Sequence, residues 1–303
     1  MGERAPGATR RRAAEGNGTA EPRLRDRVAI VTGAGRGIGK EIALGLAREG
    51  ARVVAVSRTP AEIETTIAEV ATGGGQAMAF AADVASAADV KAMVGAALER
   101  FGQIDILVNN AGTFGPIGPL LTNDSEAWVR TVMVNLVGTF LCTQAVLAGM
   151  VQRRRGSIIN LSGGGAASPR PNFTAYAASK AAIIRFTESV AQEVAADNVR
   201  VNAMAPGPVF TRLTESIIRT GPAAGAEALR EAYRQRRGDN PSLSEAVALA
   251  AFLASDESGG LSGRFISAVW DDWRGIPAQM DRITSSDLYT LRRVVPRGEG
   301  RHP

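Results

Sequence analysis

Thr32-Gly33-Ala34-Gly35-Arg36-Gly37-Ile38-Gly39 is the stretch that decides the fold of this chain. The apolar run 27–31 precedes it and is typical of a buried strand, and the apolar pattern 38–49 follows it and is typical of a packed helix. Glycine lets the backbone turn tightly and approach a ligand, and free N–H groups at a helix start favour an anion. A strand, a glycine turn and a helix in this order predict a site for a dinucleotide pyrophosphate, although such a turn alone also occurs in ordinary loops.

Strand-like runs alternate with helical patterns along the middle of the chain. The expected strands are 27–32, 52–56, 76–81, 104–108, 156–161, 199–204 and 264–269. The expected helices are 38–49, 60–72, 87–101, 125–153, 175–195 and 242–254. This alternation predicts an α/β fold, a Rossmann-like doubly wound parallel sheet of about seven strands with helices on both faces. Ligands of such sheets bind beyond the carboxyl ends of the strands.

No linker divides the region 25–270, so we expect one dinucleotide-binding catalytic domain over 23–270. Residues 1–22 are rich in Arg, Gly and Ala and are expected to be a disordered extension, with a nucleic-acid- or partner-binding arm as the less favoured alternative. Residues 271–303 are expected to form a C-terminal extension, in which the apolar residues 288–291 dock a short helix. Residues 206–240 are polar and predict a long loop, either a substrate lid or a plain surface excursion.

Composition argues against several classes of function. The net charge is +5, but the middle of the chain has no basic stripe with interleaved aromatic residues, so we do not expect a nucleic-acid partner. We expect no apolar run that reaches the length of a membrane span, and the start lacks a signal-peptide centre. The single cysteine, Cys142, fits a reducing, cytoplasmic compartment and a position in the core. The single histidine, His302, makes a His-based triad or a His-ligated metal site improbable.

The end of the second expected strand bears on the choice of cofactor. About twenty residues after the glycine turn, an NAD site places a carboxylate for the adenosine ribose. This chain has Ser57 and Arg58 there instead. Arg58 and Arg36 can pair with a 2′-phosphate, because guanidinium groups bind phosphate through paired hydrogen bonds. The sequence therefore favours NADP over NAD, and the alternative is that both arginines are merely solvated.

The expected chemical centre is Tyr176-Ala177-Ala178-Ser179-Lys180. Positions i and i+4 share one face of a helix, so the phenol and the ammonium are expected to be neighbours. A phenol has an ordinary pKa of about 10, and a nearby ammonium favours the phenolate and lowers that pKa. Lysine is rare in this arginine-rich chain, where the only others are Lys40 and Lys91. That scarcity argues against a solvated surface pair.

With these residues together, the chain resembles a classical short-chain dehydrogenase/reductase over about 25–269. The matching residues are Thr32, Gly33, Gly37, Ile38, Gly39, Asp83, Asn109, Asn110, Ala111, Gly112, Asn135, Tyr176, Lys180, Asn202, Pro206 and Gly207. The resemblance implies an NADP-dependent oxidoreductase that transfers a hydride between nicotinamide and a ketone or secondary alcohol. It also implies a homodimer or homotetramer formed through 125–153 and 175–195.

The resemblance implies a role for each matching residue. Tyr176 would exchange a proton with the substrate oxygen, Lys180 would hold the cofactor ribose and lower the pKa of Tyr176, and Asn135 would hold a water that links Lys180 to solvent. The cofactor would be bound by Gly33, Gly35, Arg36, Gly37, Ile38, Gly39, Ser57, Arg58, Asp83, Val84, Asn109, Ala111, Gly112, Tyr176, Lys180, Pro206, Gly207, Val209 and Thr211. No metal is expected.

One position departs from the family pattern. A serine normally lies thirteen residues before the tyrosine and bonds the substrate oxygen, but Gly163 occupies that position here. The loss of one such donor costs about 2.7–4 kcal/mol in the transition state. Ser162, a backbone N–H or the substrate's own hydroxyl would have to replace it. A large gain in ketone reduction by Gly163→Ser would show that the missing donor limits the reaction.

The same departure keeps two other functions open. One is a nucleotide-binding protein with a non-redox role as an isomerase, lyase or cyclase, or with no catalysis. The other is a scaffold protein that uses its arginine-rich ends. The substrate itself cannot be identified, but the expected pocket segments 113–120, 163–174, 210–240 and 270–273 contain Phe114, Phe173, Phe210 and Tyr233. These rings favour an apolar or ring-bearing substrate.

Overall fold

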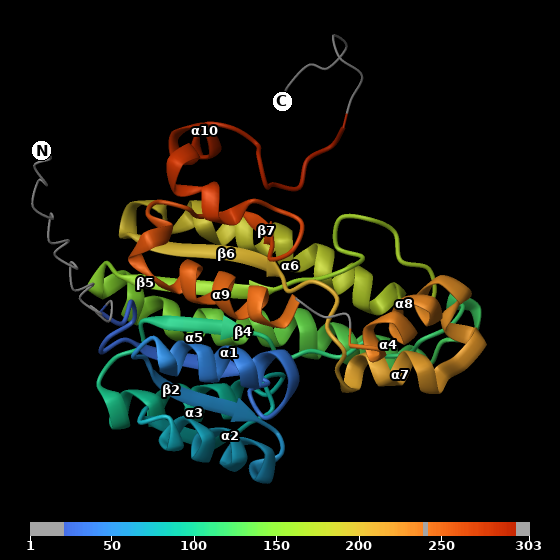
Figure 1. Cartoon of the computed structure of the whole chain (residues 1–303), viewed down its shortest axis with the longest axis horizontal. Helices are drawn as coiled ribbons and strands as arrows, with labels where there is room; N and C mark the ends of the chain where they lie inside the picture. The colour runs from blue at the N-terminus through green and yellow to red at the C-terminus, as the bar shows by residue number, and fades with distance from the viewer. Residues whose placement is uncertain (1–20, 239–241, 295–303) are drawn as a thin grey trace, which may run out of the picture.

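The computed structural model describes residues 21–238 and 242–294 (Figure 1). Seven strands of this part form one parallel sheet in the order β3-β2-β1-β4-β5-β6-β7. They are β1 (Val28–Thr32), β2 (Arg52–Ser57), β3 (Ala77–Ala81), β4 (Ile106–Asn109), β5 (Gly156–Leu161), β6 (Val199–Ala205) and β7 (Phe265–Ser267). Each expected strand is confirmed, with ends that differ by at most two residues. The strand order reverses beside β1, which places the ends of β1 and β4 at the switch point where such sheets bind ligands.

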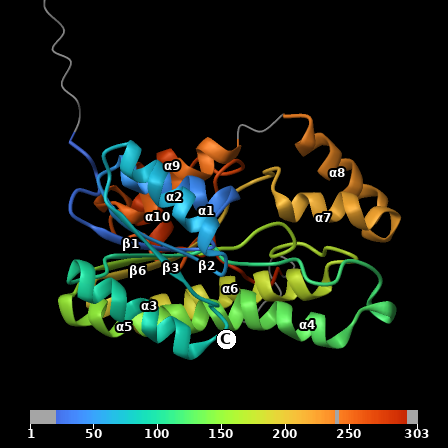
Figure 2. The ribbon, with the colours of Figure 1, turned by 90° about the horizontal axis from the view of Figure 1, so that it is seen from below.

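Helices cover both faces of the sheet, as Figure 2 shows. One face carries α1 (Gly37–Arg48), α2 (Pro60–Thr72) and α9 (Ser242–Ala254), and the other carries α3 (Ala87–Phe101), α5 (Gly138–Arg153) and α6 (Thr174–Glu193). Strand β1 explains the two layers, because alternate side chains point to opposite faces. Ala29 and Val31 belong to the core cluster under α1 and α9, whereas Ile30 belongs to the cluster under α3 and α5. A strand buried on both faces is apolar throughout, which is why its sequence shows a continuous run.

The expected helix 125–153 consists of α4 (Ser125–Val132), a π-helical turn (Met133–Val137) and α5. Because the turn does not interrupt the helix, the segment has 29 residues and is the one helix in the described part that is long and apolar enough to cross a membrane. The expectation that no apolar run reaches that length was therefore wrong. Residues Cys142, Val146 and Met150 of α5 are buried in the core against the sheet. A helix of this kind in the core of a domain is weak support for a membrane span.

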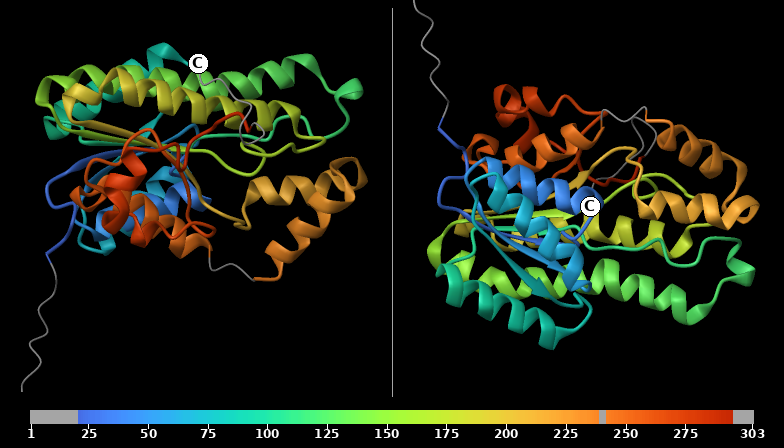
Figure 3. Two further views of the ribbon diagram at one scale, coloured as in Figure 1. Left: turned by 90° about the horizontal axis from the view of Figure 1, so that it is seen from above. Right: turned by 60° about the horizontal axis from the view of Figure 1, so that its bottom comes forward.

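Residues 206–238 contain two helices where a loop was expected, α7 (Arg212–Thr220) and α8 (Ala226–Arg236). Thr211 caps α7 by accepting a hydrogen bond from the backbone N–H of Thr214. Ile217 of α7 and Ala232 of α8 are buried in one cluster with the rings of Phe114, Phe173 and Tyr176. Tertiary packing therefore stabilises two helices whose composition is polar. Figures 1 and 3 show both helices at the end of the molecule toward which the strands point. They therefore lie where a ligand of this sheet would bind.

The segment 271–294 packs against the sheet domain. Trp273, Ile276 and Ile283 are buried in the core cluster under α9, and the short helix α10 is formed by Met280–Thr284. The residues Leu288, Tyr289 and Leu291 follow it in irregular structure, so the expected short helix lies earlier in the chain than they do. Residues 1–20, with the arginine run 10–12, and His302 lie outside the described residues. The division into 1–22, 23–270 and 271–303 stays a prediction.

The glycine turn between β1 and α1 is locked by the loop after β4. The side-chain amide of Asn110 donates to the main-chain oxygens of Thr32 at 2.9 Å and Gly33 at 3.2 Å. A Cβ atom on Gly39 would lie 2.3 Å from both the Gly33 oxygen and the Asn110 amide nitrogen. Gly39 therefore lets the first turn of α1 close onto the strand end, which no other residue type permits there.

We expect Gly39→Ala to destabilise the protein by about 1–3 kcal/mol, because the added methyl group overpacks a rigid contact. The matched control is Gly95→Ala in α3, where nothing lies within 4 Å of the added Cβ. That change should stabilise the protein by about 1 kcal/mol through helix propensity alone. Urea unfolding of both variants measures the two effects. Equal stability of the two variants would contradict this account of the turn.

Candidate active site

Tyr176 and Lys180 lie together on α6 at the carboxyl end of the sheet. Both side chains are buried, and the Lys180 Nζ atom is 5.7 Å from the centre of the Tyr176 ring. The Lys180 ammonium donates to the main-chain oxygen of Leu161, the last residue of β5, at 2.6 Å. The strand end therefore fixes the position of the lysine, and α6 fixes the tyrosine one turn away from it.

The electrostatics of this pair differ from the expectation. Burial raises the pKa of the Tyr176 phenol, and Lys180 is not the cation that opposes this effect. The nearby Arg170 guanidinium lowers the pKa of Tyr176, and Glu231 raises it. Burial also lowers the pKa of the Lys180 ammonium to about 8. The expectation that Lys180 acidifies Tyr176 therefore fails in the free protein, because removal from water outweighs the effect of a neighbour that itself tends to lose its charge.

Asn135 lies in the π-helical turn between α4 and α5 and is fully buried. Its amide nitrogen donates to the Thr113 main-chain oxygen and to the Ser179 hydroxyl, both at 2.9 Å, and its side-chain oxygen accepts from the Thr113 N–H at 2.8 Å. The π turn brings this side chain between the loop after β4 and α6. Asn135 therefore braces the helix that carries Tyr176 and Lys180, and its role in holding a water stays a prediction.

The backbone of Gly163 lies directly beside the hydroxyl group of Tyr176. A Cβ atom there would lie 2.6 Å from the Tyr176 hydroxyl oxygen, closer than such contacts occur. A serine at this position would therefore require the phenol to shift, and the effect of Gly163→Ser on ketone reduction stays to be measured. The Ser162 hydroxyl donates to the main-chain oxygen of Lys180 at 3.1 Å. Ser162 is therefore engaged with α6 and is a poor replacement for the missing serine.

The loop after β4 is hydrogen-bonded to Thr32, at the start of the glycine turn. The Thr32 hydroxyl accepts the backbone N–H groups of Asn110 at 3.0 Å and Ala111 at 3.1 Å. The buried Asn109 amide donates to Thr143 and to Asn160, so this side chain braces the sheet and α5. A Cβ atom on Gly112 would lie 3.2 Å from the Asn135 side-chain oxygen and 3.6 Å from Lys180 Nζ. Gly112 thus leaves its backbone close to both.

The start of α1 has the features of an anion site. Its N-cap residue, Arg36, makes no capping bond, and the first turn contains no acidic residue. The backbone N–H groups there therefore have no side-chain acceptor, which is what a bound pyrophosphate requires. A Cβ on Gly37 would lie 3.4 Å from the methyl group of Thr211. The turn after β1 thus meets the segment after β6, which includes Pro206, Gly207 and the buried Val209. The predicted residues fit a dinucleotide.

The adenosine side of the turn contains a carboxylate that the sequence analysis did not consider. Glu62, in the first turn of α2, accepts from Arg36 at 2.7 Å and from Arg212 at 3.4 Å. Arg58 is exposed at the end of β2, where the Ser57 hydroxyl donates to the Thr59 main-chain oxygen. An acidic residue just inside a helix that begins with proline is a usual start signal, so nothing local marks Glu62 as part of a site.

The two residues predicted to contact the adenine, Asp83 and Val84, lie in the loop after β3. Asp83 accepts a hydrogen bond from the Ala85 N–H at 3.0 Å, which closes a short turn. Val84 is buried, and its side chain would lie 2.7 Å from a Cβ atom on Gly138 at the start of α5. The structure therefore brings Asp83 and Val84 to the same sheet edge as the glycine turn.

The phenol belongs to an aromatic cluster, which we define as Phe114, Phe173 and Tyr176. The ring of Phe114 meets Tyr176 edge to face at 4.7 Å and Phe173 at 5.4 Å. Arg170 lies over all three rings, and no motif at this position marked it as part of the site. Of the other expected pocket rings, Tyr233 is exposed on α8, and Trp273 packs in the core under α9 instead.

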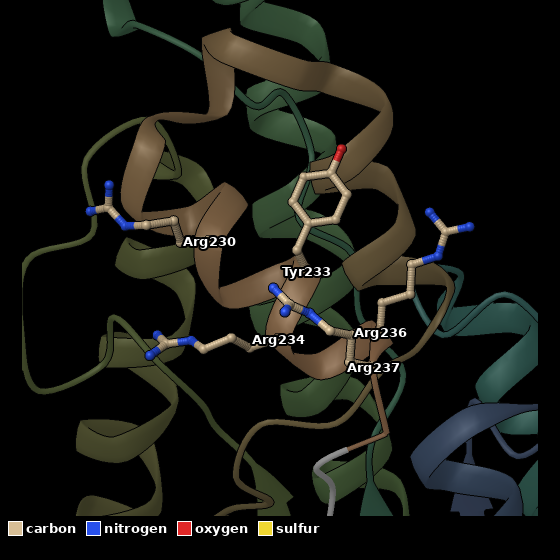
Figure 4. Close-up of a pocket in the computed structure, with 5 residues that line it drawn as sticks. All are labelled: Arg230, Tyr233, Arg234, Arg236 and Arg237. Atoms are coloured by element: carbon tan, nitrogen blue, oxygen red, sulfur yellow. The ribbon is translucent and has the colours of Figure 1, made fainter.

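A hollow of about 700 Å³ lies on α8, away from Tyr176. Figure 4 shows its lining residues, Arg230, Tyr233, Arg234, Arg236 and Arg237, pointing in different directions from one helix. Side chains that diverge do not form a binding site, so we assign none to this surface. The described part of the chain also holds no cluster of three potential metal ligands.

Known proteins share both the sequence pattern and the fold. The sequence model of the short chain dehydrogenase family matches residues 27–221. The chain is 37% identical over 244 residues to 2-(S)-hydroxypropyl-CoM dehydrogenase 3 of Xanthobacter autotrophicus, which covers 80% of this chain and 94% of that protein.

Two solved structures carry a cofactor. NAD+-bound xylitol dehydrogenase is 30% identical with a TM-score of 0.75, and it covers 80% of this chain and 98% of its own. A variant of actinorhodin polyketide ketoreductase with NADPH is 32% identical with a TM-score of 0.73, covering 80% and 95%. The fold, the glycine turn and these relatives agree: the chain belongs to the short-chain dehydrogenase family and is an NAD(P)-dependent oxidoreductase.

Proposed function

We propose that this protein is an NADP-dependent oxidoreductase that transfers a hydride between nicotinamide and a ketone or secondary alcohol, with Tyr176 as the acid/base. The observation that carries the proposal is the buried pair Tyr176 and Lys180 at the carboxyl end of the sheet. The Lys180 Nζ atom is 5.7 Å from the centre of the Tyr176 ring. The non-redox and scaffold alternatives are not favoured, because the relatives found are dehydrogenases and reductases.

The residues of this chain divide the work of the reaction. The bound cofactor supplies or accepts the hydride. In ketone reduction the Tyr176 hydroxyl donates its proton to the carbonyl oxygen, and its raised pKa keeps that proton in place at neutral pH. Lys180, held by the Leu161 oxygen, binds the cofactor ribose. Asn135 holds α6 in position through its hydrogen bond to the Ser179 hydroxyl. The aromatic cluster and the buried faces of α7 and α8 exclude water from the phenol.

The charges around the turn support NADP over NAD. Arg58 is exposed at the end of β2, and Arg36 and Arg212 pair with Glu62 in the first turn of α2. Both cofactors occur among the solved neighbours, so the preference rests on these side chains. We further propose a cytoplasmic homodimer or homotetramer that acts on an apolar or ring-bearing small molecule. Exposed Val129, Met133 and Phe140 on the helices 125–153 would be covered in such an assembly.

Tyr176→Phe is expected to reduce turnover by at least about a hundredfold, because general acid catalysis contributes about 10²–10⁴. The change should leave the affinity for NADPH nearly intact, because the ring and its contacts remain. Absorbance at the reduced-cofactor band measures turnover with ketone substrates, and fluorescence titration measures binding. Wild-type turnover in this variant would reject the assigned role.

Affinity for the cofactor should fall as the pH rises through about 8, the pKa to which burial lowers the Lys180 ammonium. The ammonium holds its proton below that value and is a stronger donor to ribose hydroxyls than the neutral amine. Titration of NADH binding between pH 7 and 9 tests this, since NADH lacks a titrating 2′-phosphate. Lys180→Met should flatten the profile, and exposed Lys91→Met should retain it. Equal slopes in all three proteins would be inconsistent with this assignment.

Arg58→Ala should weaken NADP(H) binding at least about tenfold, because a hydrogen bond to a charged group contributes about 1.5–3 kcal/mol. NAD(H) binding should stay within about twofold of wild type. Glu62→Gln should act in the opposite direction and tighten NADP(H) binding, because it removes the carboxylate that pairs with Arg36. Calorimetric dissociation constants for both cofactors measure the ratio. Parallel changes for NADP(H) and NAD(H) would exclude a 2′-phosphate site.

A further inference from the structure

Arg170 has a position in the active site that the family pattern does not assign. It lies in the loop between β5 and α6, six residues before Tyr176. Its guanidinium carbon is 4.6 Å from the ring centre of Phe173, 5.5 Å from Phe114 and 5.9 Å from Tyr176. Only 20% of the side chain is exposed. Contacts with ring faces therefore fix a cation beside the phenol.

Three consecutive glycines make room for this arrangement. A Cβ atom on Gly163 would lie 2.6 Å from the Tyr176 hydroxyl oxygen, and one on Gly164 would lie 2.9 Å from the Arg170 Nη1 atom. Gly165, at φ +94°, leaves space for the Arg170 stem, whose Cβ would be 3.0 Å away. The phenol and the guanidinium thus meet neighbouring residues of one loop. Gly163, which occupies the position of the family's serine, is therefore part of the same glycine run that leaves room for Arg170.

The guanidinium keeps most of its hydrogen-bonding capacity. It has five N–H donors. In the described part of the chain its polar contacts are a long bond to the Gly164 main-chain oxygen, 3.4 Å, and a loose ion pair with Glu231 of α8, 3.9 Å. A cation that is held by rings rather than by strong hydrogen bonds is preorganised to donate to another acceptor.

We propose that Arg170 takes the place of the missing serine and donates a hydrogen bond to the substrate carbonyl oxygen, as a catalytic residue. This inference rests on the proposed function. In ketone reduction the hydride from the nicotinamide cofactor adds to the carbonyl carbon, and the C=O π electrons move to the oxygen. That oxygen takes the proton from the Tyr176 hydroxyl, while an Arg170 N–H stabilises the negative charge that develops on it. The electrostatic effect of Arg170 on Tyr176 is consistent with this proximity.

Kinetics of four proteins with NADPH and ethyl acetoacetate test the proposal. Arg170→Met keeps an apolar stem on the rings and removes the donors, Arg170→Lys keeps the charge, and exposed Arg230→Met on α8 is the control. We expect Arg170→Met to lower kcat about 10²–10³-fold, the effect of deleting one oxyanion donor. Arg170→Lys should recover part of that loss, and the control should match wild type. An unchanged kcat in Arg170→Met would overturn the proposal.

Titration of Tyr176 provides a readout that needs no substrate. The chain has three tyrosines, so the ultraviolet difference between a protein and its Tyr176→Phe partner isolates this phenol. Among the described residues, Glu231 also acts on the pKa of Tyr176, and the Lys180 ammonium lies 5.7 Å from the ring centre; both residues are unchanged in the variants. Loss of the Arg170 cation should raise the pKa of Tyr176, and Arg230→Met should leave it unchanged. An unchanged pKa in Arg170→Met would overturn the proposal, even if wild type does not reduce ethyl acetoacetate.

The two measurements separate this inference from the proposed function. If Tyr176→Phe retains wild-type turnover, the proposed function fails, whereas the titration still reports on Arg170. If Arg170→Met lowers kcat but Arg170→Lys is equally impaired and the pKa of Tyr176 does not move, Arg170 acts only through packing, and the inference is wrong. Unfolding midpoints and NADPH affinity within error of wild type establish that the variants are folded.

Discussion

The hydrogen bond from the Lys180 ammonium to the Leu161 oxygen is the contact on which the rest of the site depends. It joins the last residue of β5 to α6, so that a strand end positions the helix face that carries the phenol. A buried cation is costly unless it is hydrogen-bonded, and among the described residues Lys180 donates to the Leu161 oxygen alone. This hydrogen bond does not fully offset the loss of water, and burial therefore lowers the pKa of the Lys180 ammonium. A further hydrogen-bond acceptor at Lys180 would stabilise its charged form.

The architecture could be predicted from the sequence because it depends on short-range patterns. The continuous apolar runs of β1 and β2 identify strands covered on both faces, and Pro60 and Gly102 mark helix ends that the structure confirms. The glycine turn was readable for the same reason, since its residues and the strand before it are adjacent. Helices α7 and α8 were not, because their polar composition hides the few residues, such as Ile217 and Ala232, that pack on the aromatic cluster.

The electrostatics of the site could not be predicted in this way. The i, i+4 spacing correctly placed Tyr176 and Lys180 side by side, but spacing contains no information about burial. Burial depends on Phe114, Phe173 and the faces of α7 and α8, which come from three separate parts of the chain. Once the phenol is dry, desolvation dominates its pKa, and the cation that opposes it is Arg170, which approaches from the loop before α6. Glu62 escaped notice for the same reason, since it meets Arg36 only in the folded chain.

The glycines at 163–165 show why the loss of a side chain is not the same as the loss of a function. In the sequence, Gly163 occupies the position at which the family normally has a serine hydroxyl. In the folded protein the space is taken by the Tyr176 hydroxyl, and the next two glycines admit Arg170. A serine restored at 163 would compete with the phenol for that space. The loop therefore contacts both the phenol and the arginine, and a side chain added at position 163 requires the phenol to shift.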